Sequence, residues 1–176
     1  MNPLSKNGNW IDAVKMSLPS HVSQLERNLD IAMNQHGLDE IDAHCCALAA
    51  AIAAGNGELA FEISMNGPLF GRPERELVTQ AVVSMSIDST YLEYLDAVDI
   101  VEYNSPKSHP LEIFEPIMTD ETGKAAVYAF AAAIVLKHNR AFALIELLKN
   151  RNFTREQVQD IATIASVISS INKVVI

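Results

Sequence analysis

One short segment gathers the side chains that could carry out chemistry. Glu40, His44, Cys45 and Cys46 lie within seven residues, and the two cysteines are the only ones in the chain. If this segment is helical, Glu40 and His44 are i, i+4 neighbours and can hydrogen-bond. Cys45 and Cys46 would point about 100° apart, and a disulfide between adjacent residues would force a strained ring. Two interpretations stay open: a single peroxide- or thiol-reactive Cys45, or two small buried cysteines.

We favour buried cysteines, because an alanine-rich stretch follows them and free cysteine is among the most buried residue types. We expect no metal ion at this segment, since adjacent cysteines lack a supporting set of ligands elsewhere in the chain. The sequence Gly55-Asn56-Gly57 lacks the preceding strand that a phosphate-binding loop needs. It therefore indicates a helix stop, and we expect no cofactor.

Lys137, His138 and Arg140 form a basic cluster in an acidic chain. The 176 residues carry a formal net charge of −9, which argues against nucleic acid and anionic membranes as main partners. Residues 91–121 hold 8 acidic and 1 basic side chains, whereas residues 122–176 hold 3 acidic and 7 basic ones. The cluster is typical of a solvated helix end, or alternatively it would bind a carboxylate or phosphate. The acidic and basic segments could also face each other within a homo-oligomer.

The elements around these residues are predicted to be helices. Alternation of β-branched residues with period two is nearly absent, whereas apolar residues recur at helical spacing. Asp39 can cap a helix that Gly55 ends, and Thr154 and Gln157 form a capping box. We predict an all-α fold with helices over 9–18, 22–32, 40–54, 58–66, 73–87, 91–103, 120–136 and 154–173, and a proline-containing loop over 104–116.

Two of these helices are apolar on nearly all sides, over 45–54 and 125–136, which predicts a central position for both. Their sequences also match, since Ala47–Ile52 reads onto Ala129–Ile134 at an offset of 82 residues. Further along, Glu76–Val78 reads onto Gln157–Gln159 at an offset of 81. We infer a single domain over 1–176 built from two similar helical repeats, at about 20–90 and 120–176.

The chain opens with Ile-Asp-Ala-Val-Lys-Met-Ser-Leu-Pro over 11–19, followed by Leu-Glu-Arg-Asn-Leu over 25–29. Three later features come in the same order as in one known family. They are an alanine-rich helix with Asn56 after it, a second alanine-rich helix, and Asn152–Glu156 before the last helix. In this pattern the chain resembles AhpD-type alkylhydroperoxidases of the carboxymuconolactone decarboxylase-like superfamily. The resemblance implies an all-helical fold with an internal repeat, assembled as a trimer or hexamer. It also implies disulfide reduction, with a peroxiredoxin as partner and a lipoyl-bearing protein as electron source.

The catalytic pattern of that family does not match this chain. Family members carry Glu-x11-Cys-x-x-Cys-x3-His in the second repeat, where a carboxylate and an imidazole move the proton that makes the thiolate. Here Lys137 and Arg140 stand at the cysteine positions, Ala125 at the glutamate and Leu144 at the histidine. The resemblance therefore extends to the fold and not to the dithiol site.

We accordingly expect an AhpD-like protein related to peroxide defence that lacks dithiol peroxidase activity and acts as a binding or regulatory relative. The alternatives are an antioxidant disulfide reductase or peroxidase that uses Cys45, and a cysteine-independent decarboxylase-like enzyme. The longest apolar run, 125–136, is shorter than the roughly 18 residues of a membrane span, and no secretion signal opens the chain. We therefore expect a cytoplasmic protein, and the acidic and basic segments favour a homo-oligomer.

Overall fold

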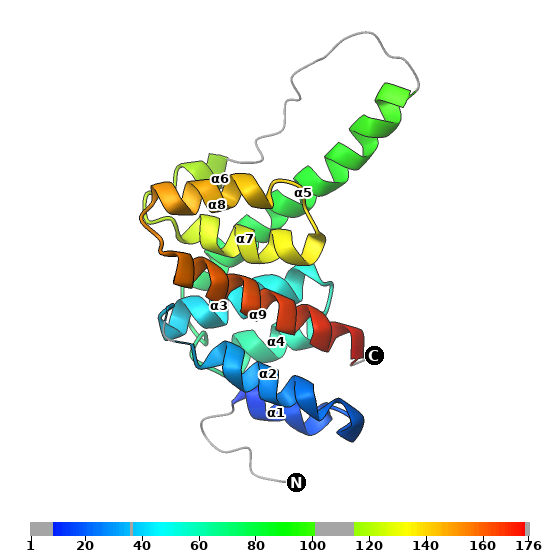
Figure 1. Cartoon of the computed structure of the whole chain (residues 1–176), viewed down its shortest axis with the longest axis vertical. Helices are drawn as coiled ribbons and strands as arrows, with labels where there is room; N and C mark the ends of the chain where they lie inside the picture. Colours follow the sequence, from blue (N-terminus) through cyan, green and yellow to red (C-terminus); the bar gives the residue numbers. More distant parts are fainter. Residues whose placement is uncertain (1–8, 36, 101–114, 175–176) are drawn as a thin grey trace.

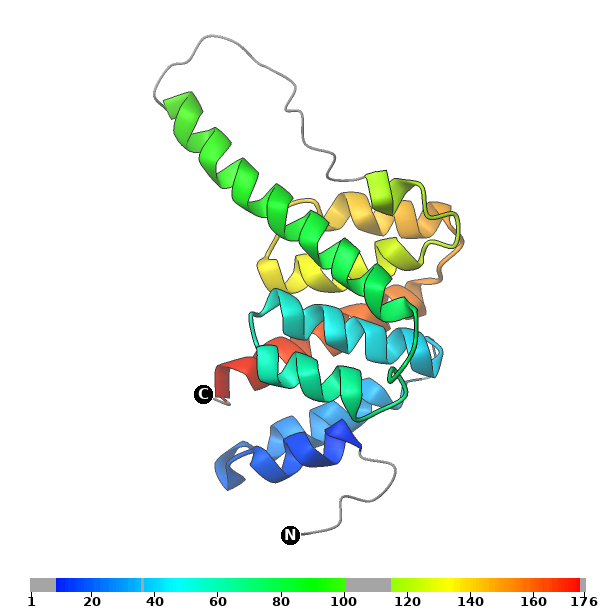
Figure 2. The same ribbon diagram turned by 180° about the vertical axis from the view of Figure 1, so that it is seen from behind.

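The chain folds into a bundle of helices, from which the second half of one long helix, α5, extends (Figures 1 and 2). The computed structural model describes residues 9–35, 37–100 and 115–174. Within these ranges there is no β-strand, which confirms the all-α prediction, and no helix is long and apolar enough to cross a membrane. The elements are α1 (Trp10–Ser17), the 3₁₀ turn η1 (Ser20–Val22), α2 (Ser23–Met33), α3 (Glu40–Ala53), α4 (Gly57–Met65), α5 (Glu74–Ile100), α6 (Glu115–Met118), α7 (Lys124–Leu136), α8 (Ala141–Asn150) and α9 (Arg155–Val174).

Side-chain caps fix the starts of α3 and α4 close to where the sequence predicts them. Asp39 accepts a hydrogen bond from the backbone N–H of Asp42 at 2.8 Å, as an N-cap residue does. Asn56 caps α4 in the same way, accepting from the backbone N–H of Leu59 at 3.0 Å. The Gly55-Asn56-Gly57 segment is therefore a helix stop followed by a new start, as predicted.

The starts of α9 and α7 also use side-chain acceptors. The backbone N–H of Thr154 donates to Gln157 Oε1 at 2.8 Å, and that of Gln157 donates to Thr154 Oγ1 at 3.2 Å, which confirms the predicted capping box. Asp120 Oδ2 accepts from the backbone N–H of Ala125 at 2.7 Å. However, α7 begins later than predicted, because Gly123, at φ 75°, first turns the chain into the helix.

The helices α3 and α7 lie at the centre of the bundle, as their apolar composition predicts. The helix α3 packs against α4, α5, α7 and α9, and α7 packs against α3, α5, α6, α8 and α9. Residues 42–51 of α3 and 125–133 of α7 are buried without a break. Alanine is frequent in both runs, so these backbones approach their neighbours closely at little entropic cost.

The helix α5 is one continuous helix of 27 residues, whereas the sequence pattern predicts separate helices over 73–87 and 91–103. The predicted boundary is wrong because neither proline nor glycine interrupts residues 74–100. Hydroxyl side chains within the helix can also bond back to the preceding turn, as Thr79 Oγ1 does when it donates to the Arg75 carbonyl at 3.0 Å. Such residues therefore do not have to end a helix.

The structure also contains a helix, α8, in a segment where the sequence analysis predicts none. Leu144 and Leu148 are buried one helical turn apart, and α8 packs against α7 and α9. That i, i+4 pair is the sequence signal for the missed helix. The end of the predicted helix over 91–103 and most of the predicted loop over 104–116 lie outside the described residues.

Candidate functional site

The two cysteines, Cys45 and Cys46, lie in the second turn of α3 as free thiols, and both are 0% exposed. Burial raises the pKa of Cys45 to about 12, and the hydrogen bond with the Tyr128 hydroxyl, which lowers this pKa, is the weaker effect. The pKa of Cys46 is raised as well, first by burial and then by the negative charge of Asp42. Since the thiolate is the reactive form, both sulfurs are held in the unreactive state and away from solvent.

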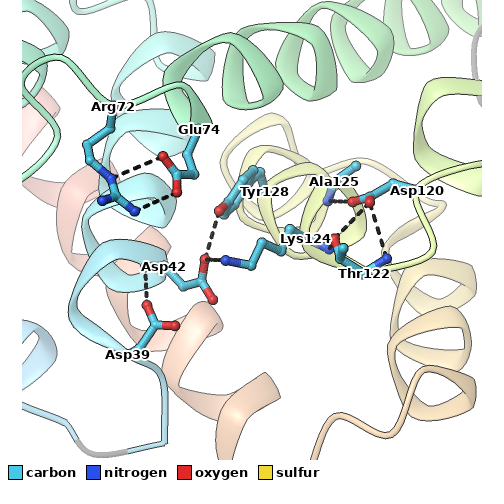
Figure 3. Close-up of polar contacts among 9 residues, drawn as sticks. All are labelled: Asp39, Asp42, Arg72, Glu74, Asp120, Thr122, Lys124, Ala125 and Tyr128. Carbon is cyan, nitrogen blue, oxygen red and sulfur yellow. Dashed lines mark hydrogen bonds and ion pairs between the residues drawn. The ribbon is translucent and has the colours of Figure 1, made fainter.

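Asp42 is the polar centre of this region, between the first turns of α3 and α7. The Tyr128 hydroxyl donates to Asp42 Oδ1 at 2.7 Å, and the Lys124 ammonium lies 3.6 Å from the same oxygen (Figure 3). Asp42 and Tyr128 are buried, whereas Lys124 reaches in from a partly exposed position. The network joins the two central helices at their N-terminal ends.

The protonation of this network follows from its burial. Burial raises the pKa of Asp42, and the hydrogen bond from Tyr128 and the charge of Lys124 lower it only in part. Burial also raises the pKa of Tyr128, and the negative charge of Asp42 adds to the effect. The phenol therefore remains a donor at neutral pH. The arrangement can hold a proton, but the thiol beside it has no access to a substrate.

His44 is oriented by Trp10 and not by Glu40. The indole Nε1 of Trp10 donates to His44 Nδ1 at 2.9 Å, and the two rings meet edge-on with their centroids 5.8 Å apart. Burial lowers the pKa of His44, and the negative charge of Glu40 opposes this shift. Within the part of the chain that the structure describes, no hydrogen bond joins His44 to Glu40, whose side chain is exposed. Glu40, His44, Cys45 and Cys46 therefore do not form one site.

Two residues of the basic cluster predicted from the sequence, His138 and Arg140, contact a carboxylate, Asp88 of α5. His138 Nε2 and Arg140 Nε each lie 2.8 Å from Asp88 Oδ2. The backbone N–H of Arg140 donates to His138 Nδ1 at 3.0 Å, so the proton of a neutral imidazole lies on Nε2, facing Asp88. The side chains of Asp88 and His138 are each 1% exposed. His138 is thus buried, and its interpretation as part of a solvated helix end is wrong.

Lys137 stands apart from this contact. It is the exposed C-cap residue of α7 and has φ 53°, in the left-handed region. Because Asp88 already faces His138 and Arg140, an anion at this site would have to compete with a buried carboxylate. Anion binding by Lys137, His138 and Arg140 stays a prediction. Thermal stabilisation by phosphate that survives the Lys137→Ala, Arg140→Ala double substitution would contradict it.

Asp42, Tyr128 and Asp88 are the site residues that the sequence analysis missed. The available signal was a charged residue on a buried helix face: Asp88 follows Ala81 and Met85 at helical spacing, and all three are buried. The partner of Asp88 is 50 positions further along the chain. Spacing along one helix cannot reveal a contact between helices.

No protein-family model matches this chain, and no curated protein matches it at a significant level of similarity. The resemblance to AhpD-type proteins therefore stays a prediction from the sequence segments quoted above.

Proposed function

We propose that this protein is an AhpD-like relative without dithiol peroxidase activity, which acts as a binding or regulatory protein. The observation that carries the proposal is the burial of both cysteines in α3, with the pKa of Cys45 raised to about 12. A protonated, inaccessible thiol can neither attack a peroxide nor open a disulfide. The segment 137–140, where the family carries its dithiol, supplies no sulfur in this chain.

We also propose that the domain consists of two similar helical repeats, as in the AhpD-like fold. In support, α3, α4 and α5 have 14, 9 and 27 residues, and α7, α8 and α9 have 13, 10 and 20. Each half thus has a buried central helix, a short helix and a long helix in the same order. The matching segments Ala47–Ile52 and Ala129–Ile134 lie in α3 and α7, the corresponding helices of the two halves.

A homo-oligomer is the third element of the proposal. Its support is an apolar stripe on α5, where Val83 and Ile87 lie one turn apart and are 49% and 42% exposed. The acidic segment 91–121 and the basic segment 122–176 supply opposite charges that could pair between copies. Sedimentation at micromolar concentration should give a species larger than the 19.3 kDa chain, and Ile87→Asp should reduce its size. A wild-type monomer would contradict this part of the proposal.

The alternative, an antioxidant enzyme that uses Cys45, has one observation in its favour: the Tyr128 hydroxyl next to the thiol, which lowers its pKa. The two functions differ in what peroxide and a dithiol donor do in the presence of the protein. With tert-butyl hydroperoxide and dihydrolipoamide, the proposed function predicts peroxide consumption at the rate of buffer alone. Turnover that rises with protein concentration and is lost in Cys45→Ala would establish the alternative.

A further inference from the structure

A groove on the surface between α3, α4 and α5 combines an apolar wall with two arginines. These three helices can be followed side by side in Figure 2. The groove has a volume of about 350 Å³. Its apolar wall includes Leu48, Ile52, Phe61 and Met65, and its arginines are Arg72 and Arg75. The exposed fraction of Phe61 is 61%, which is high for a large aromatic residue.

The two arginines differ in how their charges are compensated. Arg72 holds Glu74 with two hydrogen bonds, Nε to Oε2 at 3.2 Å and Nη2 to Oε1 at 2.7 Å (Figure 3). Arg75 donates from Nε to the Arg72 carbonyl at 3.3 Å, and its Nη1 lies 3.9 Å from Met65 Sδ. Arg75 forms no ion pair with any carboxylate in the described ranges.

Arg75, a partly exposed arginine at the groove without a carboxylate partner in the described ranges, points to an anionic ligand. The guanidinium is weakly hydrated, and its planar donors match a carboxylate. The Nη1 contact to Met65 places the cation of Arg75 beside the apolar wall, on the side of α4. A ligand that filled this groove would therefore need one anionic end for Arg75 and an apolar body for Phe61 and Ile52.

We propose that this groove binds a small amphipathic monocarboxylate, with its carboxylate on Arg75 and its hydrocarbon part against Phe61 and Met65. Small-molecule sites have volumes of about 300–1,000 Å³, so this groove suits a medium-chain carboxylate of about eight carbons. Glu76 also lines the groove. Its negative charge disfavours a second anionic group on the ligand, and a monoanion therefore fits best.

This inference gives the proposed binding protein a ligand, and it fails separately from that proposed function. Peroxide turnover would contradict the proposed function and leave the groove unaffected. Absence of carboxylate binding would contradict the proposed ligand of the groove and would leave the absence of peroxidase activity as proposed.

The test is a titration of the full chain with octanoate. Calorimetry measures the binding, and thermal unfolding measures the shift of the unfolding midpoint. Acetate, which has the anion without the chain, and octylamine, which has the chain with a cation, serve as matched ligands. We expect 1:1 binding of octanoate and a higher unfolding midpoint, with little response to the other two. An equal response to octylamine or to acetate would overturn the proposal, because apolar contact or charge alone would then suffice.

Two substitutions localise the site. Arg75→Gln removes the positive charge and keeps a polar side chain, and it should weaken octanoate binding roughly ten-fold or more. Arg27→Gln removes an exposed arginine of α2, outside the groove, and should leave binding unchanged. Phe61→Ser should weaken octanoate binding without reducing helix content, because this side chain is mostly exposed. Wild-type affinity in Arg75→Gln would overturn the proposal.

Sedimentation of the same samples tests a second copy of the chain as the occupant. We expect Phe61→Ser to leave the size of the particle unchanged. If Phe61→Ser instead dissociates an oligomer while octanoate fails to bind the wild type, the groove is a contact between copies and the proposal is wrong.

Discussion

His138 Nε2 lies 2.8 Å from Asp88 Oδ2, and this contact joins the turn between α7 and α8 to the middle of α5. Arg140 Nε lies 2.8 Å from the same oxygen, so the contact is at ion-pair distance, while both Asp88 oxygens and His138 Nε2 lack a well-aligned hydrogen bond among the described residues. A buried carboxylate depends on its few partners, because removal of one side of a buried charge contact leaves the other uncompensated.

Removal of the Asp88 carboxylate should therefore be costly. Asp88→Ala removes the carboxylate that faces the buried His138 ring and the Arg140 guanidinium, and we expect the free energy of unfolding to fall by about 3 kcal/mol. The value lies at the lower end of the range for buried pairs because the Arg140 side chain is 43% exposed and water can solvate it. Urea denaturation followed by circular dichroism measures the change.

The matched control is Asp30→Ala, which removes the carboxylate of the exposed Lys15–Asp30 pair. Surface ion pairs contribute about 0–1 kcal/mol, so this variant should remain close to wild type. Equal effects of Asp88→Ala and Asp30→Ala would show that the Asp88 cluster is solvated, contrary to the structure.

Acid should destabilise the protein through His44. Burial lowers the pKa of His44 in the folded state, and protonation of Nδ1 would break its hydrogen bond from Trp10. The unfolded state binds the proton near the ordinary pKa of 6.5, where the folded state does not, so stability falls as pH decreases through this value.

The measurement is the free energy of unfolding between pH 5 and 7, in roughly half-unit steps across the range where an unperturbed histidine titrates. His44→Asn keeps an acceptor for Trp10 and cannot titrate, so its stability should depend less on pH than that of the wild type. The control His21→Asn replaces an exposed histidine of η1 and should retain the wild-type profile. An unchanged profile in His44→Asn would refute the assignment.

The thiols should react slowly in the native protein. Because the pKa of Cys45 is raised to about 12 and that of Cys46 is raised well above its ordinary value, little thiolate is present at pH 7.5. We expect labelling by an aromatic disulfide reagent to require denaturant and then to modify both sulfurs. Rapid stoichiometric labelling of the native chain would mean that Cys45 is accessible and would favour the enzyme alternative.

The capping box should contribute measurably to stability. Thr154→Ala removes the acceptor for the Gln157 backbone N–H and should lower the free energy of unfolding by about 1 kcal/mol. Thr79→Ala, an exposed threonine inside α5, is the comparison and should change stability by no more than about 0.5 kcal/mol. If Thr154→Ala and Thr79→Ala change the free energy of unfolding equally, the capping box does not form in solution.

Local signals predicted much of the fold. Caps such as Asp39 and the box at Thr154 act within three residues, so the sequence alone contains them. The central positions of α3 and α7 followed from apolar composition, since a helix that is apolar on all sides needs neighbours on all sides. The continuity of α5 did not follow, because Asp88, Ser89 and Thr90 between the two predicted helices are weak helix formers, although, unlike proline, they do not force a helix to end.

The candidate site was less predictable from the sequence, because its contacts join residues on different helices. The segment 40–46 placed its chemistry-bearing residues close together along the chain, but the helix directs Glu40 to solvent and His44 toward Trp10. The Tyr128–Asp42 bond spans 86 positions and depends on how α3 meets α7. Contacts of this kind arise from packing, and residue spacing does not specify them.

The most direct test of the proposed function is the consumption of tert-butyl hydroperoxide with dihydrolipoamide as electron donor, measured over a range of protein concentrations for wild type and Cys45→Ala. We predict that both proteins give the rate of buffer alone at every concentration, because the buried thiol of Cys45, with its pKa raised to about 12, supplies no nucleophile. A wild-type rate that increases in proportion to protein concentration would contradict it, and the loss of that rate in Cys45→Ala would assign the activity to this cysteine.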